Sequence, residues 1–195
     1  MALYMNLVEP VYKDLVMANL VKDIRSRSNA LTAGDIGYRY VLRALENAGR
    51  SDVIFDMNSR DDVPGYGYQL KHGATALTES WQAYPSVSNN HFMLGHLMEW
   101  FYAGLCGIRQ ASGSVAFNNI EIRPQPVGDV TKASASFQSV YGLIKTDWSI
   151  TNEVFKLKVN IPPNTKAEIY FPPNDKYNKP VRVGSGNYEY VVKLK

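Results

Sequence analysis

The hydrophobic periodicity of this chain changes near residue 108, and the change predicts two structural parts. Before that position, apolar residues recur every three or four residues, which is the spacing of one face of an α-helix. Beyond it they alternate with polar residues, which is typical of β-strands that bury one face. We therefore expect an α+β chain in two parts, with a helical domain over residues 1–108 and a β domain over residues 109–195.

Three apolar stripes predict the main helices of the first part, at Met17–Ile24, Tyr38–Leu45 and Leu94–Phe101. Gly49 follows the second stripe and suits a left-handed C-terminal cap. Ser51 can then cap a short helix that runs through residue 57. A long irregular stretch, residues 58–90, separates these helices from the third stripe.

Four segments of the second part alternate between apolar and polar residues, namely Ala133–Phe137, Phe155–Ile161, Ala167–Phe171 and Tyr188–Leu194. Clusters of Pro, Asn, Gly and Ser lie between them and are typical of turns. Several short strands with such turns favour an antiparallel β-sandwich.

Composition excludes several classes of protein. With 45% hydrophobic and 20% charged residues, the chain has too much apolar surface to remain disordered. A net charge of +3 without a run of like charges argues against nucleic acid as a partner. The sequence contains no stretch of about 18 apolar residues, so it predicts no membrane span. The single cysteine, Cys106, forms no intramolecular disulfide and is expected to be a small buried hydrophobic residue.

Metal and serine-nucleophile chemistry find little support in the sequence. His91 and His96 are five residues apart, so a helix would place them on different faces, and we expect no metal site. A G-x-S-x-G elbow is lacking, which argues against a Ser-His-Asp hydrolase.

Carboxylates, amides and aromatic rings are dense between residues 61 and 100. This mixture suits a sugar, because aromatic rings stack on apolar sugar faces while carboxylates and amides bind hydroxyl groups. A packed loop with surface tyrosines would have much the same composition, so both interpretations stay open at this point.

The segments Leu31–Gly37, Asp62–Tyr68, Gly73–Trp81 and Asn90-His91 before Glu99-Trp100 resemble, in this order, the end of the catalytic domain of bacterial α-L-rhamnosidases. The downstream part resembles the closing β-sandwich of that family, including Trp148 and Gly184–Gly186. The resemblance implies an (α/α)6 barrel for the helical part. Twelve helices need about 200 residues, so we expect a partial (α/α)6 barrel followed by an antiparallel β-sandwich.

The resemblance also implies an activity, the inverting hydrolysis of terminal α-L-rhamnosides, with a rhamnose-containing glycoside as partner and no cofactor. Glu79 lies in a Gly-x-Thr-x-x-x-Glu-x-Trp segment and matches the general base of the family. The general acid is expected upstream and missing from this chain. Trp81 and His91 match residues that line the sugar subsite, and Asp35 either joins them or caps the helix that starts near residue 36.

Two alternatives remain beside the hydrolase. The chain can be a non-catalytic carbohydrate-binding or scaffolding module, or its missing helices can come from another chain. An incomplete barrel would expose the apolar edge that those helices cover, so we expect self-association through that edge.

Overall fold

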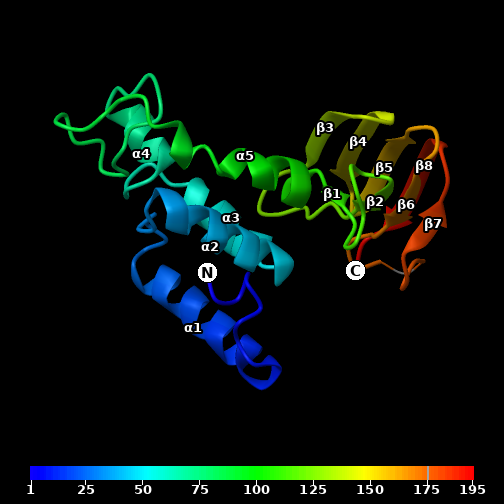
Figure 1. The fold of residues 1–195 in the computed structure, drawn as a ribbon, viewed down its shortest axis with the longest axis horizontal. Helices are drawn as coiled ribbons and strands as arrows, with labels where there is room; N and C mark the ends of the chain where they lie inside the picture. Colours follow the sequence, from blue (N-terminus) through cyan, green and yellow to red (C-terminus); the bar gives the residue numbers. More distant parts are fainter. Residues whose placement is uncertain (175) are drawn as a thin grey trace. The chain divides into compact units, whose positions relative to one another are not determined.

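The computed structural model describes residues 1–174 and 176–195 and divides them into two compact units, Met1–Trp100 and Phe101–Lys195. The first unit is helical and the second is built from β-strands (Figure 1). Among the described residues, no helix is both long enough and apolar enough to cross a membrane.

Short helices build the first unit. They are η1 (Pro10–Tyr12), α1 (Lys13–Ser26), α2 (Asp35–Asn47), α3 (Ser51–Asn58), α4 (Tyr66–Lys71), η2 (Phe92–Leu94) and α5 (Leu97–Trp100). The first two predicted helices are confirmed as α1 and α2, and the short third one as α3. Gly49 has a φ of +69°, which confirms the left-handed cap after α2.

Burial explains which helix is held most firmly. The apolar stripe of α2 is deeply buried at Tyr38, Leu42 and Leu45. The stripe of α1 is buried only at Ile24, while its other members are partly exposed. Because helix stability in proteins comes mainly from packing of the apolar face, α2 is the central helix of this unit.

Two helix predictions are corrected by the structure. The stripe at 94–101 is not one helix, because Gly95 ends the 3-10 turn η2 with a bond from its N–H to the Phe92 carbonyl, and α5 starts afterwards. Arg50, not Ser51, is the N-cap of α3. The Ser51 hydroxyl is buried and accepts a hydrogen bond of 2.9 Å from the Trp100 indole N–H, so a tertiary contact replaces the expected cap.

The second unit starts with a π-helical segment, η3 (Phe101–Leu105), and continues with eight strands. They are β1 (Ile108–Gln110), β2 (Asn119–Ile122), β3 (Lys132–Ser139), β4 (Gly142–Thr151), β5 (Val154–Ile161), β6 (Lys166–Ile169), β7 (Val181–Val183) and β8 (Gly186–Lys193). They form two four-stranded sheets, in the orders β1-β2-β6-β7 and β3-β4-β5-β8.

The predicted strands are confirmed as β3, β5, β6 and β8. The predicted antiparallel sandwich is confirmed, with one difference: β2 and β6 pair in parallel. The long strand β4 was not predicted, because a polar residue interrupts its alternation of apolar residues. This residue, Thr146, is fully buried, and its hydroxyl donates to the Cys106 carbonyl at 2.9 Å.

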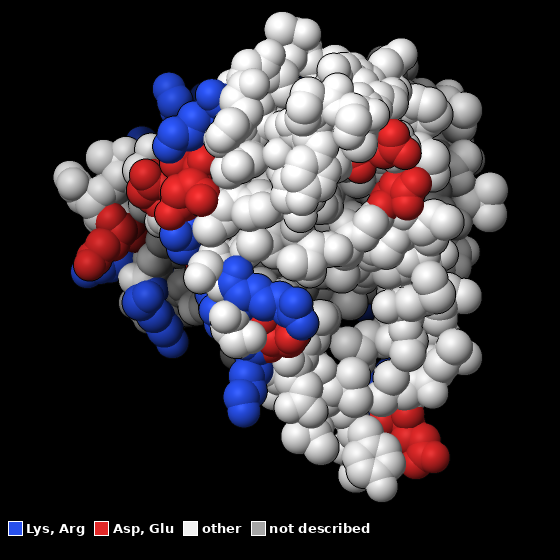
Figure 2. Space-filling view, turned by 90° about the vertical axis from the view of Figure 1, so that its left-hand side faces the viewer, with Lys and Arg blue, Asp and Glu red and all other residues white. Residues whose placement is uncertain are grey.

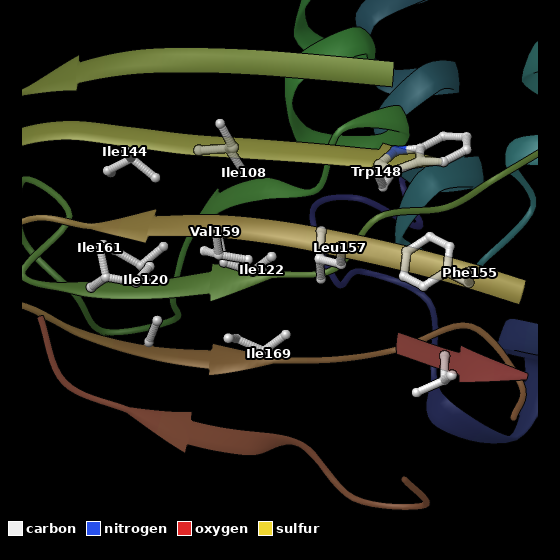
Figure 3. Packing of buried hydrophobic residues seen from close by; sticks show 12 residues of the cluster. Ile108, Ile120, Ile122, Ile144, Trp148, Phe155, Leu157, Val159, Ile161 and Ile169 are labelled. Carbon is white, nitrogen blue, oxygen red and sulfur yellow. The ribbon is translucent and has the colours of Figure 1, made fainter. Parts of the chain in front are cut away.

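The inner faces of the two sheets form one hydrophobic core (Figure 3). One sheet contributes Ile108, Ile120, Ile122 and Ile169, and the other contributes Ile144, Trp148, Phe155, Leu157, Val159 and Ile161. The Trp148 indole N–H donates to the Leu105 carbonyl at 2.9 Å, which fixes the end of η3 against this core. Burial of each large side chain contributes about 1.5–3 kcal/mol to folding.

Candidate functional site

An aromatic cluster anchors the loop that carries the candidate site. The Trp81 ring is only 5% exposed and meets the edges of the Tyr38 and Tyr66 rings, with centroid distances of 5.0 and 5.1 Å. Its indole N–H donates to the Ala33 carbonyl at 2.8 Å. Trp81 therefore ties the loop after α4 to the segment that precedes α2, and it offers a sugar little ring surface.

The tyrosines of this cluster stay protonated. Burial is the main reason why the pKa of Tyr66 is raised to about 12, and burial also raises the pKa of Tyr38 well above its usual value. The Tyr38 hydroxyl is at hydrogen-bond distance from Asn58 Oδ1, and the Tyr66 hydroxyl donates to the Leu94 carbonyl. Both phenols thus act as structural donors.

Glu79 lies on the loop between α4 and η2, and its neighbours fix the backbone. Thr78 is buried and its hydroxyl donates to the Ser80 carbonyl at 2.6 Å, which also accepts from the Gln69 amide at 3.0 Å. Buried side chains at 78 and 81 therefore point inward on either side of Glu79, and the Glu79 side chain is exposed.

Ser88 holds Glu79 from the other arm of the same loop. The Glu79 N–H donates to the Ser88 carbonyl at 2.9 Å, and the Ser88 N–H lies 3.3 Å from Glu79 Oε2. Further along, the His91 N–H donates to the Leu77 carbonyl at 2.8 Å. The two arms are thus joined at residues 77 and 79, and the Ser88 N–H holds one oxygen of the exposed Glu79 carboxylate.

Asp35 and His91 lie together, although 56 positions separate them in the sequence. The distance from His91 Nε2 to Asp35 Oδ2 is 3.4 Å. Asp35 is the first residue of α2 and accepts from the Ile36 N–H at 2.9 Å, while Gly34 is the N-cap. The interpretation of Asp35 as the helix cap is therefore wrong. Its negative charge in the first turn still favours the helix dipole.

The structure thus brings the four predicted site residues into two connected segments. The Trp81 indole N–H donates to the carbonyl of Ala33, two positions before Asp35. The His91 N–H donates to the carbonyl of Leu77, two positions before Glu79. The segments 33–35 and 77–91 are consequently linked by both an indole hydrogen bond and the Asp35–His91 contact.

An ion-pair network on α2 and α5 was not predicted from the sequence. Arg39 makes a bidentate pair with Glu99, at 2.8 and 3.0 Å. Arg43 lies 3.1 Å from the buried Glu46 and 3.7 Å from Glu99. Burial and the charge of Arg39 lower the pKa of the neighbouring His96, which favours its neutral form. These ion pairs hold α5 against α2. Because Arg39 and Arg43 are far from Glu99 in the sequence, no local sequence pattern predicts that they pair.

Much of the surface at the α4 end of the helical unit is uncharged, and its acidic and basic side chains occur in small groups (Figure 2). Exposed residues of the loop after α4 include Tyr84, Asn89 and Asn90, and Phe92 at the start of η2 is exposed as well. In the part of the chain that the structure describes, no three His, Cys, Asp or Glu side chains are grouped so that they could hold a metal ion. The chemistry available around Glu79 is therefore that of a carboxylate, amides, imidazole and aromatic rings.

Comparisons with known families assign the two units. Residues 1–105 match the family model described as the bacterial alpha-L-rhamnosidase 6 hairpin glycosidase domain. Residues 107–185 match the bacterial alpha-L-rhamnosidase C-terminal domain. The class is thus that of the six-hairpin glycosidases, and the predicted helical barrel part with a C-terminal β domain is confirmed. The chain belongs to the bacterial α-L-rhamnosidase family.

Individual relatives agree with this assignment. An α-L-rhamnosidase of Streptomyces avermitilis is 32% identical over 181 residues, which cover 88% of this chain and 17% of the relative. An α-L-rhamnosidase of Formosa agariphila is 29% identical, and the matched region covers all of this chain and 22% of the relative. The chain therefore spans about a fifth of the length of the curated relatives it matches.

Solved structures give the same result. The Streptomyces avermitilis α-L-rhamnosidase in complex with L-rhamnose superimposes with a TM-score of 0.89 at 30% identity, over 98% of this chain and 21% of that one. The enzyme of Aspergillus terreus gives a TM-score of 0.89 at 27% identity, over 98% and 23% of the two chains.

Proposed function

We propose that this chain is the C-terminal portion of an α-L-rhamnosidase that hydrolyses terminal α-L-rhamnosides with inversion of the anomeric carbon. Glu79 is the general base, and the general acid belongs to polypeptide outside this chain. Membership of the family supports the activity, and the share of about a fifth of the relatives' length supports the division of the catalytic pair.

The observation that carries the proposal is the setting of Glu79. Its carboxylate is exposed, so water can reach it, and the paired backbone contacts with Ser88 fix its direction. A general base needs both features, because it must contact a water molecule and hold that water on one face of the sugar ring.

In the proposed reaction, Glu79 removes a proton from water while the water oxygen forms a bond to the anomeric carbon. The bond from that carbon to the glycosidic oxygen breaks on the opposite face, and the general acid protonates the departing oxygen. The two carboxyl groups of such a pair are about 6.5–9.5 Å apart, which leaves room for the water. The sugar released is L-rhamnose with inverted configuration at the anomeric carbon.

Substrate contacts are assigned to the residues around the base. His91 and Asp35, joined at 3.4 Å, offer an imidazole and a carboxylate to sugar hydroxyl groups. Trp81 enters the proposal through the loop that it anchors, since its indole bond to Ala33 and its burial hold the backbone beside Glu79.

The test uses the polypeptide that contains this chain together with the rest of the catalytic domain, and an aryl α-L-rhamnoside as substrate. Removal of the base by Glu79→Gln is expected to lower kcat/KM by about 10²–10⁴-fold. The matched control is Glu9→Gln, an exposed glutamate of the same unit, which is expected to leave the rate unchanged. Equal rates for both variants would refute the assignment. Binding of rhamnose without hydrolysis by the unsubstituted polypeptide would favour the non-catalytic module.

A further inference from the structure

Strand β3 is an edge strand of the β unit, and half of its backbone polar groups face away from the sheet. In the sheet order β3-β4-β5-β8, it pairs only with β4 among the described residues (Figure 1). The Ile150 N–H donates to the Thr131 carbonyl at 2.7 Å, and hydrogen-bonded positions alternate along an antiparallel pair. The backbone groups that face away from β4 are therefore those of Lys132, Ser134, Ser136 and Gln138.

The edge formed by β3 lacks protection against pairing. Edge strands of natural proteins usually carry features that prevent it, such as short length, charges, proline or a bulge. The edges of the other sheet, β1 and β7, have three residues each, and β8 carries Glu189 and Lys193. In contrast, β3 has eight residues, pairs one-to-one with β4, contains no proline and has a single charge at its first residue, Lys132. Among the sheet edges that the structure describes, β3 is thus the one open to another strand.

The side chains of β3 leave this edge accessible. Ser134 and Ser136 are short and exposed. Phe137 is paired with the core residue Ile144 and shares its face of the sheet, yet Phe137 is 37% exposed. This inner-facing ring stays accessible because β3 ends the sheet. A further strand beside β3 would bond the outward-facing backbone groups and remove the Phe137 ring from water.

We infer that β3 pairs with β3 of a second copy of this chain, antiparallel across a two-fold axis at Ala135. The outward-facing positions are symmetric about residue 135, so in this register each of them has an outward-facing partner. Ser134 lies opposite the partner's Ser136, and Lys132 lies opposite the partner's Gln138. Each such pair exchanges two backbone hydrogen bonds, so the two copies of the sheet become continuous.

Side chains and charges fit this register, which is why the inferred occupant is a second copy. At the axis, the two copies of Ala135 lie opposite each other. Phe137 lies opposite the partner's Ala133, so a large ring meets a small side chain. The two copies of Lys132 are at opposite ends of the paired strands and do not repel each other. A shift of two residues in either direction would leave one outward-facing position of each copy outside the paired region.

The contact is small and independent of the other proposals. Two paired strands bury less than the roughly 1,200 Å² of a standard interface, so the dimer is expected to be weak, with a dissociation constant of about 1 mM. It lies in the β unit, whereas the barrel edge expected from the resemblance lies in the helical unit. The proposed hydrolysis and this pairing can therefore fail separately.

Disulfide trapping of the 195-residue chain tests the pairing, because a disulfide accumulates even a weak dimer. Opposite residues of a non-hydrogen-bonded pair have Cα atoms about 4.5 Å apart, which is within the range of a disulfide. Ala135→Cys is therefore expected to give covalent dimers in a glutathione buffer, as seen on a non-reducing gel. The matched control is Gln138→Cys on the same strand, whose two copies would lie about 20 Å apart in this register. The unsubstituted chain measures any reaction of the buried Cys106.

A second pair of variants tests the backbone bonds. In the Ala135→Cys chain, Ser134→Pro removes an outward-facing N–H and leaves the bonds to β4 in place. The rate of cross-linking is expected to fall by about tenfold, because each dimer loses two hydrogen bonds. Ser134→Ala keeps this N–H and is expected to keep the rate, and circular dichroism checks that both variants fold.

Three results would overturn the inference. The first is no covalent dimer of Ala135→Cys above the level of the unsubstituted chain. The second is an equal yield from Gln138→Cys, which would mean random collision. The third is an unchanged rate in the Ser134→Pro variant. The comparison of Ala135→Cys with Gln138→Cys decides the question even where the proline variant does not fold.

Discussion

At the scale of single residues, one short loop contains both structural side chains and the proposed general base. Its relevant residues are Thr78, Glu79 and Trp81. Thr78 and Trp81 are buried and hydrogen-bonded, while Glu79 between them is exposed. The sequence pattern alone predicted an irregular stretch here. Glu79 was found by family resemblance, because a single exposed glutamate has no distinguishing periodicity.

Replacement of Trp81 tests its anchoring role. Trp81→Leu removes the bond to Ala33 and two ring contacts, and we expect the free energy of unfolding to fall by about 3 kcal/mol. Tyr84→Leu, at a ring that is 54% exposed, serves as control and should change it by less than about 0.5 kcal/mol. Urea denaturation followed by circular dichroism measures both. Similar small losses in the two variants would contradict the anchoring role.

The single cysteine gives a pH prediction. Burial raises the pKa of Cys106 to about 11, above its value in the unfolded chain. The stability that the neutral thiol contributes is therefore complete below the unfolded pKa and is lost as the pH rises toward 11. At pH 9 we expect iodoacetamide to modify the folded chain far more slowly than the chain in urea, as mass spectrometry would show. Equal rates would mean that the thiol is accessible.

At the scale of elements, two glycines with a similar positive φ allow the cost of backbone strain to be distinguished from the cost of steric crowding. Gly107 has a φ of +78° and Gly113 one of +73°. A Cβ at 107 would lie 2.2 Å from the Pro124 nitrogen, whereas one at 113 would have nothing within 4 Å. We expect Gly113→Ala to cost about 1 kcal/mol and Gly107→Ala at least about 3 kcal/mol. Thermal unfolding measures the difference, and equal melting temperatures would contradict it.

The elements that the sequence predicted are those with long, regular apolar patterns. The stripes of α1 and α2 and the alternation of β5 and β8 are of this kind. The strands β1, β2 and β7 have only three or four residues, and no longer alternating segment contains them. The strand β6 is equally short, but the alternation around it continues to Phe171 and could be recognised. The six-residue helix α4 has a glycine as its N-cap and another inside, so it showed no helical signal.

Contacts between distant residues were beyond sequence reasoning. The parallel pairing of β2 with β6 joins segments that are separated by three other strands. The Asp35–His91 contact and the Arg39–Glu99 pair likewise connect residues that no local rule relates. Such contacts depend on how the elements pack, and this explains why the resemblance supplied site residues but not their partners.

At the scale of the whole molecule, the helical unit exposes apolar side chains near its start. Leu7 and Val11 are each 76% exposed and Leu15 is 60% exposed. Contiguous exposed apolar patches often mark the contact surface of a partner. We therefore predict that the chain self-associates at micromolar concentration, as measured by sedimentation velocity.

Charged substitutions locate that contact. Val11→Lys together with Leu15→Lys is expected to shift the equilibrium to monomer, because a lysine in an apolar interface loses hydration. The control is Val140→Lys, at a valine of the β unit that is 82% exposed. A clean monomer for the unsubstituted chain, or dimers that persist in the double variant, would exclude association through this surface.

The rate of hydrolysis by Glu79→Gln tests the central claim, the role of Glu79 as general base, most directly. In the polypeptide with the complete catalytic domain, kcat/KM for an aryl α-L-rhamnoside should fall by about 10²–10⁴-fold in this variant, because an amide of the same shape cannot take a proton from water. The Glu9→Gln control should keep the full rate. An unchanged kcat/KM in the Glu79 variant would show that another group is the base.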